Sequence, residues 1–247
     1  LKRAVEIVPD EAGAWFNLGN ALTEQNEWQE ASEAFNKALK LEPNLIEGYV
    51  NWGDALTRAG DYNAALEIFH VGLTRSPFHP GLLSNKGNVL LRQHRIMEAL
   101  PFLEQAAQAM PNNAVTTRNL ANAYRLSGDF VGALATLDPL IKQNPYDADA
   151  RCIRALALFS VGNYTRAWSD YAMRWRSEHH EGARPFQQPL WSGQNLRGKT
   201  ILIWGEQGVG DEIMFGTSLP ELESMGARII IEIEYRLVPL LRRAFPK

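Results

Sequence analysis

Proline recurs at a fixed interval through most of this 247-residue chain. The series starts at Pro9, and each later member follows the previous one by 34 residues: Pro43, Pro77, Pro111 and Pro145. Alanine recurs at the same interval, as Ala31, Ala65, Ala99, Ala133 and Ala167. A fixed step of this length over five units indicates one supersecondary motif used repeatedly, so the repeat must be explained before any other feature.

Each unit reads as a pair of helices joined by a tight turn. The small alanine allows the two helices to approach closely. The turn carries Asn26, Gly60, His94, Gly128 and Gly162, which are residues that suit a left-handed backbone. The proline ends the second helix, because it cannot continue one. We therefore expect a mainly helical chain, a right-handed α-solenoid of five hairpins that start near residues 12, 46, 80, 114 and 148, after a partial repeat.

The residues of these units resemble the tetratricopeptide repeat (TPR) family over residues 1–178. The first full repeat carries the pattern almost intact: Trp15, Leu18, Gly19, Leu22, Ala31, Phe35, Ala38 and Pro43. The third departs from it, because Lys86 occupies a position that is usually apolar. Residues 1–9 match only the end of a second helix, so we expect both ends to be cut from a longer protein with further repeats upstream.

Two polar positions recur within the first helix of the repeats. One is held by Asn17, Asn51, Asn85 and Asn119, and the other by Asn20, Asp54, Asn88 and Asn122. The two positions lie three residues apart and so share one helix face. An amide offers one acceptor and two donors, and can pair with the backbone of an extended peptide whatever its side chains are.

These rows resemble the asparagine ladder of the O-GlcNAc transferase repeat domain, in which the first helices line a concave groove. The resemblance implies an extended peptide or protein as the partner. The alternative is that these amides bond only to neighbouring helices or to water. In the fifth repeat the rows change to Ile153 and Leu156, so we expect another segment of the chain to cover that surface. Cys152, the single cysteine, reads as a packing residue.

Composition narrows the function further. The formal charge of −3 gives no reason to expect a nucleic-acid partner, and no apolar run is long enough to span a membrane. With one cysteine and no recognisable leader we expect a cytoplasmic protein. The pair His179 and His180 has no second ligand motif, so we expect neither a metal nor a cofactor in these residues. The sequence leaves the oligomeric state open.

The pattern changes after the repeats. Residues 179–199 lack helical periodicity and are expected to be a linker, and residues 200–247 to be an incomplete domain. Residues 200–204 are a continuous apolar run typical of a parallel strand, and a glycine-rich turn follows. We then expect a helical stretch over 212–225, which Pro220 kinks or splits. A strand over 228–234 and a helix over 237–244 complete the segment. This order predicts the opening βαβ unit of a Rossmann-like sheet.

The glycine-rich turn carries Glu206, Gln207, Gly208, Gly210 and Asp211. This string resembles bacterial tetratricopeptide proteins whose C-terminal part is glycosyltransferase-like, similar to the heptosyltransferases of the two-domain GT-B fold. By position, the resemblance implies Asp211 as the base that activates an acceptor hydroxyl, with a nucleotide-sugar donor bound mainly by a domain that this chain lacks. The chain alone is therefore expected to be inactive. A bare helix cap is the alternative role for Asp211.

The sequence thus predicts a peptide-binding TPR module joined to the start of a sugar transferase. Two alternatives remain. The chain could be a non-catalytic scaffold that assembles protein complexes. Less well supported is a dinucleotide-binding oxidoreductase, because the turn lacks the third glycine of the dinucleotide fingerprint.

Overall fold

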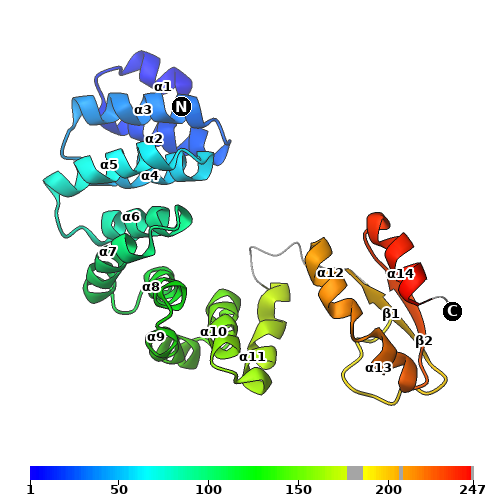
Figure 1. The fold of residues 1–247 in the computed structure, drawn as a ribbon. Coiled ribbons are helices and arrows are strands. Elements are labelled where there is room, and N and C mark those ends of the chain that lie inside the picture. Colours follow the sequence, from blue (N-terminus) through cyan, green and yellow to red (C-terminus); the bar gives the residue numbers. More distant parts are fainter. Residues whose placement is uncertain (177–185, 206–207, 246–247) are drawn as a thin grey trace. The chain divides into compact units, whose positions relative to one another are not determined.

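A computed structural model describes the chain except residues 177–185, 206–207 and 246–247. The chain divides into two compact units, residues 1–183 and 184–247. Among the described residues, every regular element of the first unit is a helix, and the second unit contains both strands. Each unit is described by itself below (Figure 1).

The first unit is a stack of helical hairpins preceded by the short helix α1 (Lys2–Ile7). The first helices of the five hairpins are α2 (Ala12–Glu24), α4 (Ile46–Ala59), α6 (Pro80–Arg92), α8 (Ala114–Ser127) and α10 (Ala148–Ser160). The second helices are α3 (Trp28–Leu41), α5 (Tyr62–Arg75), α7 (Ile96–Ala109), α9 (Phe130–Gln143) and α11 (Tyr164–Tyr171). Within each series every helix begins 34 residues after the previous one. The predicted helical solenoid is confirmed.

Small residues bring the two helices of a hairpin together. The five periodic alanines are completely buried, as the spacing predicted. Glycine at a second position lets an aromatic ring of the second helix lie directly against the first: a Cβ added to Gly19 would lie 2.7 Å from the ring of Phe35. Phe35 and its counterpart Phe69 are fully buried. The first two repeats therefore share one close packing contact between glycine and an aromatic ring.

The turn between the helices requires a left-handed residue. Gly60, Gly128 and Gly162 have positive φ angles, and so do Asn26 and His94 at the equivalent position. Asparagine tolerates this conformation better than most residues, whereas glycine adopts it without steric cost. The predicted role of this position is confirmed.

The first and second helices form different faces of the stack. Each first helix contacts the first helix of the next repeat, whereas successive second helices make no comparable contact within the described residues. The first helices therefore lie on the inner side of the curve and the second helices splay apart on the outer side. We call these the inner face and the outer face.

Aromatic residues end the solenoid. The short 3₁₀ helix η1 (Ala172–Arg176) follows α11 and packs on α10. Phe159 lies edge-on to Trp168 with centroids 4.8 Å apart, and Tyr171 contacts both rings. Trp168 and Leu156 remain exposed to 49% and 40%. The covering segment that we expected over this surface falls partly on residues 177–185, outside the described part of the chain, so it stays a prediction.

The second unit holds two parallel strands and the helices between and after them. Strand β1 (Thr200–Trp204) pairs with β2 (Arg228–Glu232), with Thr200 opposite Arg228 and Trp204 opposite Glu232. Helices α12 (Val209–Gly216) and α13 (Leu219–Ser224) connect the strands, and the 3₁₀ helix η2 (Tyr235–Leu237) and helix α14 (Val238–Ala244) follow. The strands were predicted correctly to within two residues, and the helical stretch is split before Pro220, one of the two outcomes that we expected.

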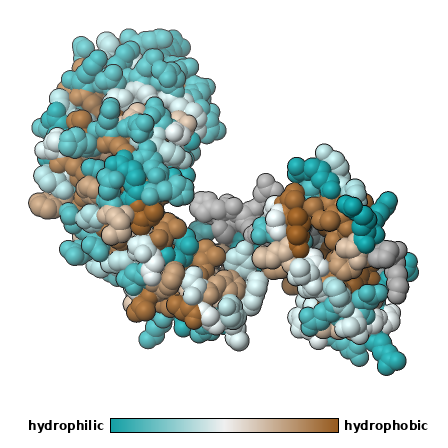
Figure 2. All heavy atoms as spheres, viewed as in Figure 1, coloured by the Kyte–Doolittle hydropathy of each residue, from teal (hydrophilic) through white to brown (hydrophobic). Residues whose placement is uncertain are grey.

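Two short strands are too few to define a doubly wound sheet. The structure thus shows a parallel β–α–α–β unit and not the Rossmann-like fold that the sequence led us to expect. No residue of either strand is fully buried. Apolar residues gather on one side of this unit (Figure 2). A hollow of about 240 Å³ between α12 and α14 is lined by Ile213, Leu240 and Leu241.

Candidate functional site

The two polar rows lie on the first helices, on the inner face of the stack. Of the first row, Asn17 is exposed and Asn51, Asn85 and Asn119 are half-buried. The second row is half-buried throughout: Asn20, Asp54, Asn88 and Asn122. These side chains come from α2, α4, α6 and α8 at equivalent positions of consecutive repeats. The fully buried core between the helices includes none of them.

Half of these side chains are already engaged within the chain. Asn51 Nδ2 donates to Asn20 Oδ1 at 2.8 Å, which joins the two rows across neighbouring repeats. Asp54 accepts from Arg58, and Asn122 accepts from Arg125. These contacts match the alternative interpretation, in which the rows bond to neighbouring helices.

The other four side chains of the two polar rows form no hydrogen bond to any residue that the structure describes. They are Asn17, Asn85, Asn88 and Asn119. Three of them lie together on α6 and α8, in the middle of the array. Their amide groups therefore have donors and acceptors to offer to a ligand or to water.

Arginines beside the rows are committed to intramolecular partners. Arg118 Nη1 lies 2.9 Å from Asp147 Oδ2, and the same carboxylate accepts from Ala150 N at the start of α10. Arg125 is tied to Asn122, and burial lowers the pKa of its guanidinium. The polar rows, rather than these cations, are therefore the groups available on the inner face.

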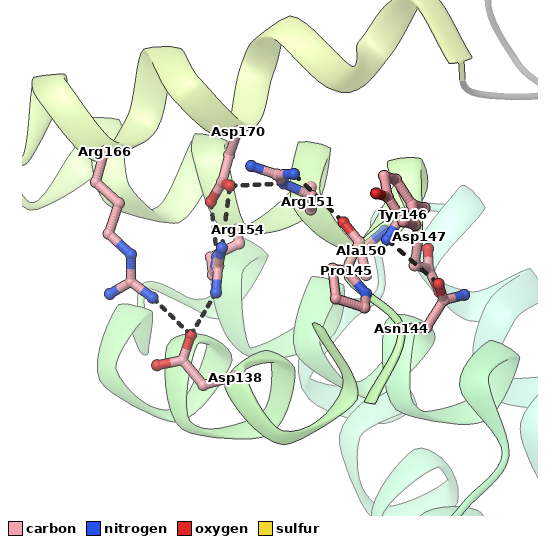
Figure 3. A network of polar contacts seen from close by, with 10 residues as sticks. All are labelled: Asp138, Asn144, Pro145, Tyr146, Asp147, Ala150, Arg151, Arg154, Arg166 and Asp170. Carbon is pink, nitrogen blue, oxygen red and sulfur yellow. Dashed lines mark hydrogen bonds and ion pairs between the residues drawn. The ribbon is translucent and has the colours of Figure 1, made fainter. Parts of the chain in front are cut away.

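The fifth repeat contains an ionic network that we did not expect from the sequence. Arg154 on α10 donates to Asp138 on α9 at 2.7 Å and to both oxygens of Asp170 on α11 (Figure 3). Arg151 also donates to Asp170, and Arg166 to Asp138. Two sequence signals were available: arginine replaces the buried leucine of the repeat pattern, and an aspartate follows it 16 residues later.

Asp170 is the buried centre of this network, with only 1% of its surface exposed. Burial raises the pKa of the Asp170 carboxyl, but the hydrogen bonds from Arg154 and Arg151 outweigh it and hold that pKa below its ordinary value. The carboxylate is therefore charged and paired at neutral pH. Because every group in the network has a partner, its role is to join α9, α10 and α11.

Cys152 lies half-buried on α10 beside this network. Burial is the main cause that raises the pKa of the Cys152 thiol, to about 11. A thiol with so high a pKa holds very little thiolate at neutral pH, and thiolate is the nucleophilic form. The prediction that Cys152 is a packing residue agrees with this environment.

In the second unit the glycine-rich turn follows β1. Glu206 and Gln207 lie outside the described residues. Helix α12 begins after Gly208, and Gly210 and Asp211 lie in its first turn, with Asp211 half-buried. The N-cap is thus Gly208, which has no side chain. The alternative role of Asp211 as the N-cap residue is therefore wrong.

Glu212, next to Asp211, is the carboxylate that ties this turn to the sheet. Its Oε2 accepts from the backbone N–H of Glu234, just after β2, at 2.9 Å. A Cβ at Gly205 would overlap the carboxylate of Glu212 in this position, so glycine leaves room for the contact. Asp211 lies in the first turn of the helix that follows the carboxyl end of β1, and ligands bind beyond this edge in open parallel sheets. We did not expect this role of Glu212 from the sequence.

The described part of the chain meets the requirements of neither a metal site nor a membrane-spanning helix. Its histidines, cysteine and carboxylates form no cluster of three or more that could hold a metal ion. Over the same residues, no helix combines the length and apolar character that a membrane span needs.

Comparison with known proteins identifies the first unit. Tetratricopeptide repeat models match residues 12–45, 50–114 and 90–158. The chain belongs to the tetratricopeptide repeat family. None of these matches reaches the second unit, so the resemblance of that unit to glycosyltransferases rests on the motif alone.

Individual known proteins match about two thirds of the chain. Protein FlbA of Caulobacter vibrioides is 33% identical over 174 residues, which is 67% of this chain and 29% of FlbA. The chain thus spans less than a third of that relative. Among solved structures, YrrB, described as a TPR protein with an unusual peptide-binding site, superposes with a TM-score of 0.57 at 23% identity, over 70% of this chain and 89% of YrrB. MamA from Desulfovibrio magneticus RS-1 gives 0.59 at 22% identity, over 65% and 91%. These likenesses show the fold.

Proposed function

We propose that the chain is a protein-binding scaffold whose inner face holds an extended segment of a partner. The observation that carries the proposal is the set of unengaged amides on adjacent first helices, centred on Asn85, Asn88 and Asn119. An extended peptide presents a donor and an acceptor at each residue, so regularly spaced amides suit its backbone. The peptide-binding site named for YrrB is consistent with this use of the fold.

Contact with the backbone makes the interaction tolerant of the peptide's sequence. Each amide bonds to groups that every residue carries, so affinity arises mainly from the number of such bonds. Specificity then comes from the side chains at the borders of the rows. The internal bond between Asn51 and Asn20 leaves these two amides less capacity for a ligand. The partner is therefore expected to contact α6 and α8 most strongly.

Selection and substitution test this proposal together. Peptides that bind the 247-residue chain are first selected from a random display library. Their affinities for the wild type and for the Asn85→Ala/Asn119→Ala variant are then compared. A loss of about 0.5–1.5 kcal/mol per amide is expected. Asn36 and Asn63 lie on second helices and serve as the matched control pair, with no expected effect. If the selected peptides bind the first double variant as they bind the wild type, the inner-face amides do not hold them.

A second proposal concerns the β–α–α–β unit, which we propose is the start of a glycosyltransferase-like domain of a longer protein. The supporting observation is Asp211, half-buried in the first turn of α12 beyond the carboxyl ends of two parallel strands. A carboxylate near a helix N-terminus is held ionised and can accept a proton from an attacking hydroxyl. In such a protein a nucleotide sugar would be the donor, and the repeats would select the protein acceptor.

A further inference from the structure

The outer face contains a hollow between the second and third repeats. Because successive second helices splay apart there, a gap opens between α5 and α7, and α6 lies beneath it. The hollow has a volume of about 400 Å³. Leu66, Leu90 and Phe102 supply apolar walls, and Lys86 and His70 supply polar groups. Its size suits one amino-acid side chain with part of its flanking backbone.

Lys86 occupies the repeat position that Leu18 and Leu120 fill in other repeats. Its side chain is half-buried, and Nζ lies 4.3 Å from the centroid of the Phe102 ring. Burial, and to a lesser extent the charge of Arg95, lowers the pKa of the Lys86 ammonium. A buried cation costs stability relative to leucine unless a counter-ion accompanies it.

The fifth repeat shows what such a counter-ion looks like. Arg154 holds the same repeat position and is paired with Asp138 and Asp170, each 16 residues away along the chain. The residues at the same separations from Lys86 are His70 and Phe102. Both of these positions therefore hold a carboxylate around Arg154, whereas neither of them does around Lys86.

Two glutamates line the hollow, Glu67 and Glu98, but neither is the counter-ion of Lys86. Glu98 is committed to Arg95, with Nη2 to Oε2 at 2.7 Å. Neither Glu98 nor Glu67 forms an ion pair with Lys86 within the part of the chain that the structure describes, and neither contributes to the shift of the Lys86 pKa.

We propose that this hollow binds an acidic side chain of a protein partner, which pairs with Lys86 as Asp170 pairs with Arg154. The partner segment carries aspartate or glutamate beside apolar residues, because the carboxylate meets Lys86 while Leu66, Leu90 and Phe102 form the walls. This site lies on the outer face. It is therefore separate from the inner-face amides, and a scaffold with both could hold two partner segments at once.

The test uses two tripeptide probes and the whole 247-residue chain. Acetyl-Leu-Glu-Leu-amide and its glutamine counterpart are titrated into protein whose lysines carry ¹³C-labelled methyl groups, with the Lys86 signal assigned through its loss in Lys86→Arg. We expect the glutamate probe to shift the Lys86 signal saturably, with an affinity about tenfold higher than that of the glutamine probe. Lys37, which lies exposed over the Trp15 ring at 4.1 Å, is the internal control and should not shift.

Variants separate a binding role from a structural one. In ¹⁵N-labelled protein, Lys86→Leu should abolish the response of the amide signals of Leu90 and Phe102 to the glutamate probe, whereas Lys86→Arg should retain it. Lys86→Leu should also keep or raise the unfolding temperature, because leucine fills the equivalent position of the first and fourth repeats. The proposal is overturned if both probes shift the Lys86 signal equally, if the Lys37 signal responds alike, or if Lys86→Leu still responds as the wild type does.

Discussion

Arg154 and Asp170 form a bidentate ion pair inside the last hairpin, with Nε to Oδ2 at 2.7 Å and Nη2 to Oδ1 at 3.0 Å. Arg154 stands where the first and fourth repeats bury Leu18 and Leu120, so an ionic contact replaces an apolar one at this junction. Bidentate geometry fixes orientation as well as distance. The pair therefore sets how α11 lies on α10.

Removal of one partner should be costly. Asp170→Asn leaves Arg154 and Arg151 without their buried counter-charge, so we expect the free energy of unfolding to fall by about 3–5 kcal/mol. Asp138→Asn is the matched control, because the Asp138 side chain is 47% exposed and its loss should cost no more than about 1 kcal/mol. Urea unfolding of both variants measures the difference. Equal losses in the two variants would show that burial of the pair does not matter.

The same pair predicts an acid dependence of stability. The pKa of the Asp170 carboxyl is lower in the folded chain than its ordinary value of about 3.9. The stabilisation is therefore complete above the unfolded-state pKa and is lost as the pH falls through the folded-state pKa. As the pH falls below the ordinary pKa of an aspartate, the wild type should therefore lose more stability than Asp170→Asn, which has no carboxyl group to protonate at this position. Parallel pH profiles would contradict this account.

Alanine at position 53 should be tolerated only when Phe69, which packs against Gly53, is replaced by a smaller residue. A Cβ at Gly53 overlaps the ring of Phe69, so Gly53→Ala is expected to destabilise the chain by about 1–3 kcal/mol. The fourth repeat pairs Ala121 with Leu137 at the equivalent positions. Gly53→Ala combined with Phe69→Leu should therefore be more stable than the sum of the single changes, by about 1 kcal/mol. Strict additivity in this double-mutant cycle would disprove the contact.

Cys152 should alkylate slowly. With a thiol pKa of about 11, its thiolate fraction near pH 7 is about a hundredfold below that of an ordinary cysteine. Initial rates with iodoacetamide should keep rising tenfold per pH unit up to the highest pH at which the chain stays folded. The urea-unfolded chain is the control and should show an ordinary pKa. A plateau near pH 9 in the folded chain would contradict the predicted environment.

Asp211 can be tested only in a longer protein that carries a complete glycosyltransferase-like domain. There, Asp211→Asn should reduce sugar transfer by roughly 10²–10⁴-fold, the usual contribution of a positioned base, without a change in peptide affinity. Exposed Glu223→Gln on α13 is the matched control and should transfer normally. Normal transfer by the Asn variant means that the base lies elsewhere.

Most of the solenoid could be predicted from the sequence because each repeat depends on local rules. Alanine, the turn residue and proline each have a steric reason, and the repetition of Ala31 and Gly60 at a fixed step makes the pattern visible. The strand at residues 200–204 was equally clear, because a short β-branched run has few other uses.

The ionic contacts could not be predicted in the same way. Arg154 and Asp138 belong to different repeats, and their meeting depends on how adjacent hairpins stack. Sequence alone also favoured Asp211 in the glycine-rich turn, whereas the structure shows that Glu212 makes the contact to the backbone after β2. Asp211 and Glu212 are adjacent on a helix, so their side chains point in different directions. Which of the two makes the contact depends on the residue at which the helix begins, which is Val209.

The central claim is that the inner-face amides hold the backbone of an extended peptide. The most direct measurement compares a library-selected peptide with versions that are N-methylated at single backbone positions, and with versions in which single side chains become alanine. The account predicts that N-methylation at alternate positions lowers affinity by about tenfold, because each methyl group removes one donor, and that this loss disappears in Asn85→Ala/Asn119→Ala. If N-methylation has no effect while alanine substitutions abolish binding, the chain recognises side chains and the claim is contradicted.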